Sequence, residues 1–348
     1  MRLETFRTDN QQNKVYRSDL YPLLIMQKRL FLLCLILSSF AINDLSAQRF
    51  TRSKRYTSVG VSVNAMNYFG DITPSESFTS TDLQFTRYNI GVHLTRRYTP
   101  RFSGRFSFNY GRIKADDYES QSPTDNNARF RYIRNASFRT SIYELSAVGI
   151  IDLIENRQSY LRRPEFVPYV FGGVAGFYYN PKSQAPAEFG GPNTWVALQP
   201  LRTEGKSYSL FQIAIPVGVG FRYKAGPRWD ISFEIGYRYL FTDYLDDVSG
   251  NYPDPAAYGN NQLARAMSNR TYEERSASGN DRQRDVVVLQ RLGYNYEDVD
   301  SPGGVFKSVE GYTPGEKRGS PNEKDWYVVT GFHLNYLLIR GVRCPKFR

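Results

Sequence analysis

The stretch WDISFEIGYRYLF (Trp229–Phe241) alternates between two kinds of residue. Every second position is large and apolar or aromatic, and aspartate, serine, glutamate, glycine and arginine stand between them. A period of two residues is that of a β-strand. The stretch is longer than the roughly five or six residues usual in a soluble domain, and a tilted strand needs about 9–11 residues to cross a bilayer. It therefore predicts a membrane-crossing strand with a lipid face and a lumen face.

The same alternation recurs in seven other stretches, at residues 59–69, 88–94, 102–110, 143–153, 167–179, 211–223 and 326–336. It is less clean in 143–153, where Val148 and Ile150 fall on the inner face, and it is ambiguous in 167–179, where both faces are apolar or glycine. Short connections (97–101, 156–165, 224–228) alternate with long ones (71–84, 114–137, 180–207, 243–325). This asymmetry is typical of outer-membrane barrels, and closure removes the sheet edges. The sequence predicts an all-β fold over residues 57–343: an eight-stranded antiparallel closed transmembrane β-barrel with short periplasmic turns and long extracellular loops.

A soluble barrel with its bulky face inward is the alternative fold. Trp229, Phe233, Tyr237 and Phe241 would then all point into the interior from one strand. Eight strands enclose a lumen that side chains just fill, so eight such faces would overfill it. The small residues on the opposite faces fit a narrow lumen better, which favours the membrane barrel.

The amino-terminal part of the chain carries a targeting signal. Residues 26–47 combine two basic residues, an apolar run and a small residue before a cleavage position, which is the pattern of a secretory signal peptide. The apolar run is shorter than the roughly 20 residues of a spanning helix. Residues 1–25 lack this pattern, so we expect them to be a leader or to precede the true start at Met26.

Composition narrows the class of partner. The formal net charge is +11, but no run of lysine and arginine is dense enough to favour nucleic acid. The only cysteines are Cys34, inside the signal peptide, and Cys344, in a tail (344–348) that we expect to be periplasmic, so no disulfide framework follows. We expect contacts with outer-membrane lipid and lipopolysaccharide, and none with nucleic acid.

Charged residues on the predicted inner faces should form a network in the lumen. The residues are Arg87, His93, Arg105, Glu144, Asp152, Arg222, Asp230, Glu234, Arg238 and His333. Unpaired charges in a dry lumen are costly, so neighbouring strands predict pairs of Arg105 with Glu144, and of Arg222 with Asp230 or Glu234. Such a network stabilises a plugged barrel without a pore.

The sequence predicts no catalytic residue, cofactor or metal ligand. The only histidines, His93 and His333, fall near mid-membrane, away from the rim where lipid or peptide would enter. No GxSxG, HExxH or GxxxxGK motif occurs, and no cysteine–histidine spacing suggests zinc. The acidic stretch TDYLDDVSGNYPDP (242–255) lacks the spacing of a calcium-binding loop. We interpret its acids as rim and turn residues, with calcium at the rim as the alternative.

The loop over residues 243–325 is unusually long. Loops of this length are mostly functional or disordered. Residues 263–285 could hold a short helix, and residues 285–299 carry enough apolar side chains to fold back on the barrel rim. We expect this loop to act as a lid, a partner surface or both.

Three segments resemble a known family. NYFGDI (67–72), YLFTDYLDDVSGNY (239–252) and CPKF (344–347) are similar to segments of the PorG-like outer-membrane barrels of Bacteroidetes, whose named member belongs to the type IX secretion system. The residues that carry the resemblance are Asn67, Tyr68, Gly70, Asp71, Asp243, Tyr244, Asp246, Asp247 and Cys344. It implies a barrel that links the outer membrane to a periplasmic ring of a lipoprotein and its partner.

The resemblance also implies a contact surface on the short-turn side. This side is basic, and its arginines are Arg97, Arg101, Arg162, Arg163, Arg228 and Arg343. An acidic periplasmic partner would complement it, although ordinary turn composition explains it equally well. We therefore expect a non-enzymatic structural or assembly component of a type IX-like secretion or gliding apparatus in the outer membrane. A lipid-modifying or proteolytic barrel enzyme, and a surface-binding barrel acting through its outer loops, are the alternatives.

Overall fold

The computed structural model describes residues 54–72, 85–120, 129–279, 283–284, 287–302, 304–322 and 324–338, all within the unit Phe50–Arg348. The predicted leader, the signal peptide, Arg343 and the tail with Cys344 lie outside the described residues. None of the described helices is long and apolar enough to cross a membrane.

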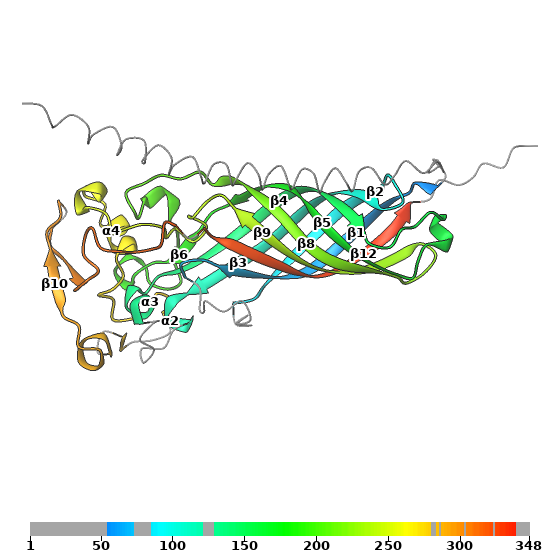
Figure 1. Cartoon of the computed structure of the whole chain (residues 1–348). Coiled ribbons are helices and arrows are strands. Elements are labelled where there is room, and N and C mark those ends of the chain that lie inside the picture. The colour runs from blue at the N-terminus through cyan, green and yellow to red at the C-terminus, as the bar shows by residue number, and fades with distance from the viewer. Residues whose placement is uncertain are drawn as a thin grey trace, which may run out of the picture. The chain divides into compact units, whose positions relative to one another are not determined.

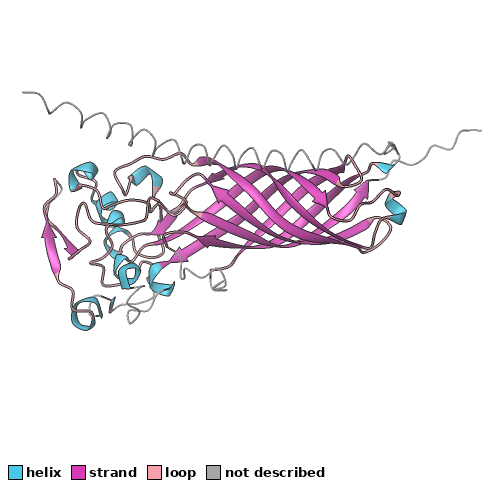
Figure 2. Cartoon of the chain, viewed as in Figure 1, coloured by secondary structure: helices cyan, strands magenta, loops and turns pink. Residues whose placement is uncertain are grey.

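Eight long strands form a closed antiparallel barrel (Figures 1 and 2). They are β1 (Thr57–Phe69), β2 (Arg87–Arg97), β3 (Phe102–Asp116), β4 (Ser137–Asp152), β5 (Phe166–Tyr179), β8 (Phe211–Lys224), β9 (Trp229–Leu240) and β12 (Trp326–Leu338). Each strand pairs with the next in this order, and β12 pairs with β1, which closes the sheet. The predicted fold class is confirmed.

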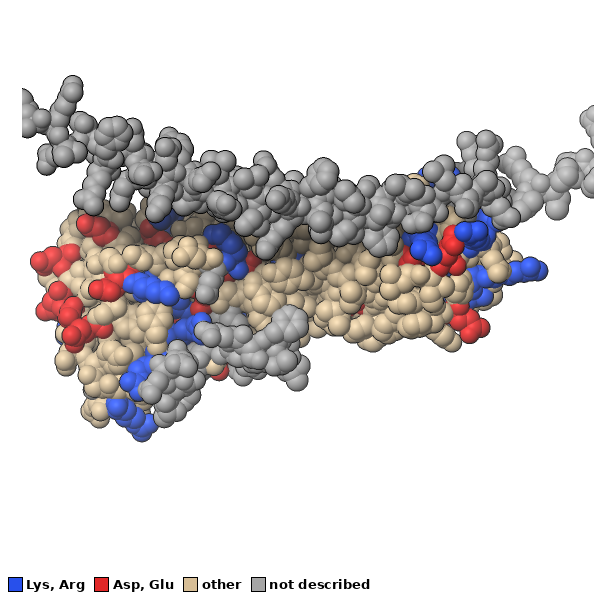
Figure 3. Space-filling model, viewed as in Figure 1, with Lys and Arg blue, Asp and Glu red and all other residues tan. Residues whose placement is uncertain are grey.

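Alternation along each strand sorts the side chains into two environments. Large apolar side chains on the outer face of every strand are exposed. One example from each strand, in order, is given by Val61, Val92, Phe106, Leu145, Val174, Val217, Ile231 and Leu334. Figure 3 shows an uncharged band between two ends where charged side chains gather. A continuous apolar surface of this kind is unfavourable in water and matches the hydrocarbon core of a bilayer. The chain is therefore an outer-membrane barrel, and the soluble alternative with its bulky face inward is wrong.

The ambiguous stretch in β5 also has an inner and an outer face. Val170, Val174 and Tyr178 face outward and are exposed, whereas Phe171 and Phe177 are buried inside. Both faces look apolar in the sequence because these inner aromatic rings help to fill the lumen.

The long connections fold into a cap at one end of the barrel, opposite the short turns (Figure 1). We use "cap" for the described parts of residues 70–72, 117–136, 180–210 and 241–325. Its elements are α2 (Asp117–Ser120), α3 (Arg129–Arg134), β6 (Lys182–Gln184), η3 (Ala187–Phe189), β7 (Trp195–Ala197), η4 (Gln199–Leu201), η5 (Pro255–Tyr258), α4 (Gln262–Ser268), η6 (Val287–Arg291), β10 (Tyr296–Val299) and β11 (Phe306–Val309). On the short-turn side, η2 (Tyr160–Arg162) precedes β5.

The cap has its own apolar core. Tyr132 and Ile133 from α3 pack with Tyr252, Val288 and Val309 from the long 243–325 segment. β6 pairs with the cap end of β4, and β7 pairs with β6. β10 pairs with β11 in a separate hairpin. The described part of the longest loop is thus folded, with helix α4 in its first third.

Candidate functional site

Charged side chains in the lumen form ion pairs. The pairs are Arg105–Glu234, Arg238–Glu144 (3.4 Å), Arg222–Asp152 (3.2 Å), Arg97–Asp152 (3.5 Å) and Arg163–Asp230 (2.8 Å). Tyrosine hydroxyls complete two of them, because Tyr169 donates to Glu234 at 2.5 Å and Tyr327 donates to Glu144 at 2.7 Å. Buried carboxylates with this many partners link the strands of the barrel to one another across the lumen.

The pairing expected between β3 and β4 is wrong. In their register Arg105 lies opposite Val148, whereas Glu144 lies opposite Asn109, so the two charges are four positions apart along the sheet. The Arg105 guanidinium instead reaches Glu234 on the far wall and donates to both of its oxygens, one at 2.9 Å. A narrow lumen brings opposite walls within the length of one arginine side chain.

The expected partner of Arg222 is also wrong. Arg222 lies on β8 and pairs with Asp152 on β4, with β5 between them, rather than with Asp230 or Glu234 on the adjacent β9. Arg87 lies at the cap end of β2, where its Nη1 donates to the carbonyl of Thr86 at 2.8 Å.

The two histidines meet in the packed lumen. The rings of His93 and His333 lie 5.2 Å apart. His93 Nε2 lies 2.7 Å from Asn335 Oδ1, and His333 Nε2 lies 3.7 Å from a Glu234 oxygen. The lumen cavity that both histidines line is only about 20 Å³, room for about one water molecule. This arrangement can hold the strands in place but offers no space for a substrate.

Arg97 and Arg163 close the short-turn end of the barrel instead of facing the periplasm. Both are nearly fully buried. Arg97 pairs with Asp152 and donates to the carbonyl of Asn156 at 3.2 Å. Arg163 pairs with Asp230 and donates to the carbonyls of three residues in and beside the 225–228 turn. The expectation that these two arginines belong to an exposed partner surface is therefore wrong. Their guanidinium groups bind carboxylates and carbonyls at the barrel mouth.

Other arginines of the short-turn side remain exposed. Arg101, Arg162 and Arg228 face solvent at three separate turns. Arg96 and Arg157 are exposed near them, and Glu165 is an exposed acid on the same side. This end of the barrel thus presents a basic surface even without the two buried arginines.

At the cap end, acidic residues from distant parts of the chain meet under the cap. Tyr68 Oη lies 2.6 Å from Asp246 Oδ2 and 2.8 Å from Asp325 Oδ1. A side chain on Gly70 would collide with both Tyr68 and Asp325, because its Cβ would lie 2.0 Å from each. We call Tyr68, Asp71, Asp243, Asp246 and Asp325 the rim cluster. Its existence explains why the turn after β1 needs a glycine at position 70.

The geometry of the rim cluster requires a proton on one of its carboxyl groups. A tyrosine has one hydroxyl proton, so Tyr68 can donate to only one of its two carboxyl neighbours, and the other short contact requires a protonated carboxyl. Burial, and then the charges of neighbouring acids, raises the pKa of Asp246 well above its usual value. Burial also raises the pKa of Asp325 well above its usual value, and that of Asp243 to about 7. The acids of this stretch lie at the rim, and Asp246 also accepts a turn hydrogen bond from the Val248 amide at 2.9 Å. The sequence did not indicate that they are buried against Tyr68 and Asp325.

Other described residues of the family resemblance lie near this junction. Asp71 accepts hydrogen bonds from the Ser320 amide at 3.0 and 3.1 Å. Asp247 accepts one from the Tyr208 hydroxyl at 2.7 Å, and the Tyr208 ring stacks on that of Tyr244. Asn67 lies on β1 opposite Val328, and Cys344 lies outside the described residues. Within the described residues, no group of three or more histidine, cysteine or acidic side chains is arranged to hold a metal ion.

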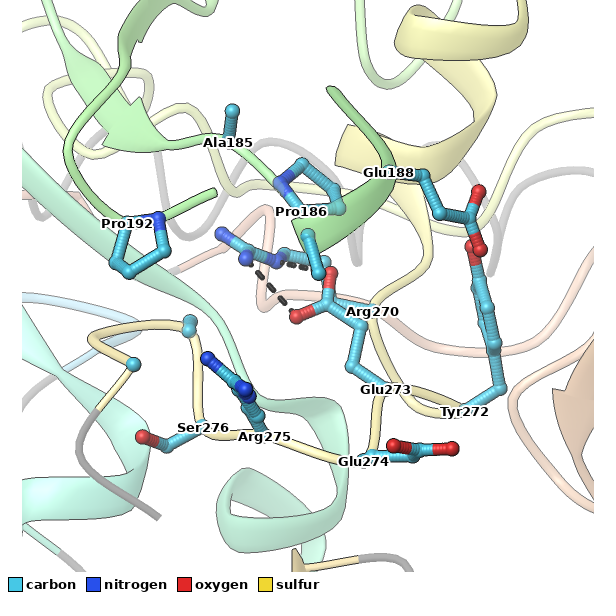
Figure 4. A pocket seen from close by; sticks show the side chains of 13 residues that line it. Ala185, Pro186, Glu188, Pro192, Arg270, Tyr272, Glu273, Glu274, Arg275 and Ser276 are labelled. Carbon is cyan, nitrogen blue, oxygen red and sulfur yellow. Dashed lines mark hydrogen bonds and ion pairs between the residues drawn. The ribbon is translucent and has the colours of Figure 1, made fainter. Parts of the chain in front are cut away.

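The cap contains a pocket of about 370 Å³ that no sequence motif indicates (Figure 4). Residues 185–192 form one side, and residues 270–279 form the other. Arg270 binds Glu273 through two contacts of 2.7 and 2.9 Å. Figure 4 shows Arg275 extending toward the middle of the pocket and Tyr272 beside Glu188. Burial and the Glu188 charge raise the pKa of Tyr272 to about 12, so its hydroxyl stays a donor.

Several solved structures of outer-membrane proteins match the chain. Neisserial surface protein A has 10% identity and a TM-score of 0.35, over 80% of this chain and 96% of that one. OprG of Pseudomonas aeruginosa has 8% identity and a TM-score of 0.34, over 82% and 96%. Ail of Yersinia pestis, crystallised with the heparin analogue sucrose octasulfate, has 8% identity and a TM-score of 0.33, over 82% and 99%. These identities and scores are low, and the barrel is established by the strand pairing of this chain itself.

No curated protein matches the chain. A family model matches residues 30–273, which is well over half of the chain and runs from the predicted signal peptide into the cap. The chain therefore belongs to the family described as Domain of unknown function (DUF6089).

Proposed function

We propose that this barrel is a non-enzymatic structural component of a type IX-like secretion or gliding apparatus, and that it anchors a periplasmic partner through its short-turn side. The observation that carries the proposal is the basic surface formed by Arg101, Arg162 and Arg228. Arg97 and Arg163 are buried in the ion pairs that close the barrel mouth beneath this surface. The exposed arginines do not take part in these pairs. A rigid, charged, closed end suits docking to an acidic partner.

The packed lumen supports a structural role over transport or catalysis. Its ion pairs link strands that are not adjacent in the barrel, and each of two lumen cavities holds about one water molecule. The link to type IX secretion comes from the resemblance of the segments around Tyr68 and Asp246, which meet in the rim cluster. That contact makes the shared segments a structural joint between barrel and cap.

Charge reversal tests the anchoring. The double variant Arg101→Glu with Arg162→Glu should abolish co-purification with the periplasmic ring lipoprotein and its partner. Arg291→Glu with Lys307→Glu, at exposed positions of the cap, is the matched control and should leave co-purification unchanged. Retention of the partners by the short-turn variant, or their absence from the wild-type complex, contradicts the proposal.

The cap pocket favours a second candidate function, the binding of an anionic surface ligand. The pocket is lined by Arg270, which pairs with Glu273, and by Arg275, Glu188 and Glu274. Arg275 extends toward its middle and is the group that would contact an anion. A glycan array with sulfated and unsulfated saccharides tests this function. Binding that is confined to sulfated saccharides and lost in Arg275→Ala would favour it, and equal binding by the variant would exclude it.

A further inference from the structure

A groove runs along the lipid-facing surface of the barrel over β1. Its floor is formed by Val59 and Val61, and its volume is about 590 Å³. Phe106 and Phe108 of β3 line one side, and Trp229 and Tyr336 line the other. These side chains are almost entirely carbon, and they lie in the half of the barrel nearer the short turns.

The groove follows from the sequence of β1. In register, Val59 is flanked by Leu94 and then Phe106 on one side, and by Tyr336 and then Trp229 on the other. The outer face of β1 carries only valine at 59, 61 and 63, so small side chains stand between rows of large aromatic ones. The rings of Trp229 and Tyr336 contact each other at 4.9 Å and form a firm wall.

The short-turn end of the groove is basic. Arg228 is exposed, and its Nη1 donates to the Tyr336 hydroxyl at 3.1 Å, which places the guanidinium beside the wall of the groove. Arg96 follows Leu94 on the outer face of β2, lies opposite Thr57 of β1, and is also exposed. Two guanidinium groups thus flank the point where the apolar groove reaches the membrane surface.

We propose that the groove binds one anionic phospholipid of the periplasmic leaflet, with an acyl chain over Val59 and Val61 and the phosphate between Arg96 and Arg228. The apolar walls bind the acyl chain of the lipid, because the chain fills the surface depression and packs against the aromatic side chains on both sides. The arginines recognise the negative headgroup at the interface. Lipopolysaccharide does not fit, because its phosphates lie in the outer leaflet on the cap side.

Native mass spectrometry of the full chain, released from nanodiscs of phosphatidylglycerol and phosphatidylethanolamine, tests the site. The wild type should retain one phosphatidylglycerol in preference to phosphatidylethanolamine. Val61→Trp fills the groove and should lose this lipid. Val219→Trp, on β8, is the matched control, because Val61 and Val219 are similarly exposed (51% and 56%) and position 219 lies outside the groove; it should retain the lipid.

A second pair of variants keeps the test independent of folding at position 61. Arg96→Gln and Arg228→Gln should each lower the preference for phosphatidylglycerol about fivefold, as expected for one arginine at an anionic surface. Retention by Val61→Trp equal to the control, no retained lipid in the wild type, or photo-crosslinking from position 61 to protein instead of lipid would each overturn the proposal. The anchoring variants at Arg101 and Arg162 do not line the groove, so the two proposals fail separately.

Discussion

Glu234 shows how one side chain can join several strands of a barrel. Its carboxylate on β9 accepts hydrogen bonds from Arg105 on β3 and Tyr169 on β5, and it lies 3.7 Å from His333 on β12. Four strands therefore depend on one negative charge. A buried charge with partners contributes little by itself, but removing one partner leaves the other uncompensated.

Glu234→Gln should therefore lower the free energy of unfolding by about 3–5 kcal/mol, because the buried Arg105 charge loses its partner. The double variant Arg105→Met with Glu234→Met should recover most of this loss, since it removes both charges. Equilibrium urea unfolding in lipid vesicles measures the effect. Arg157→Ala is the control, because the Arg157–Glu155 pair is largely exposed and should contribute only about 0–1 kcal/mol. Equal losses in the single and double variants would contradict the pairing argument.

Two carboxyl groups at the base of the cap share one tyrosine hydroxyl. Asp246 and Asp325 contact the same hydroxyl of Tyr68, and Asp325 also accepts a hydrogen bond from the Leu245 amide at 2.8 Å. The contacts thus join the end of β1 to both ends of the long 243–325 segment. Since ionising both acids would place two negative charges on one buried hydroxyl, the cap should be held most firmly when a proton is present.

The stability of the cap should fall as the pH rises. The pKa values of Asp246 and Asp325 are raised in the folded state, and that of Asp243 is raised to about 7. A carboxyl with a raised folded pKa contributes stability that is fully present below its unfolded pKa of about 3.9 and is lost as the pH rises through the folded value. Hydrogen exchange in the cap should therefore be slower at pH 5 than at pH 8, by up to about tenfold per pH unit for each titrating group.

Asp325→Asn separates this mechanism from the general pH dependence of exchange. The amide cannot ionise, so the excess of exchange at high pH should shrink, with the rates corrected for intrinsic exchange. Asp298→Asn, at an exposed position of β10, should leave the wild-type profile unchanged. A cap that becomes more protected from pH 5 to pH 8 would show that its acids are not held as protonated groups.

At the scale of the whole molecule, the sequence predicts the barrel because its signal is local. Alternation along each strand is enough to identify the faces, and it even places Arg97 on the same face as His93, so extending the β2 pattern by four residues would have predicted its burial. The ion pairs are not predictable in this way. Arg105 and Glu234 are 129 positions apart, and Tyr68 and Asp325 are 257 apart. Their contacts depend on strand tilt and loop packing, which no short stretch of sequence encodes.

Three ion pairs cross the lumen one above another, and we predict that the barrel does not conduct ions. Arg163–Asp230 closes the short-turn end, Arg105–Glu234 crosses the middle, and Arg238–Glu144 lies toward the cap. An ion would have to displace each ion pair in turn, and each cavity between them holds about one water molecule.

Planar bilayer recordings should show no conductance steps for the wild type, with a porin in the same bilayer as the positive control. Arg163→Ala should be silent as well, because two ion pairs remain beyond the one it opens. Steady steps from the wild type would disprove the sealed lumen, and steps from Arg163→Ala alone would show that the ion pair at the short-turn end is the whole barrier.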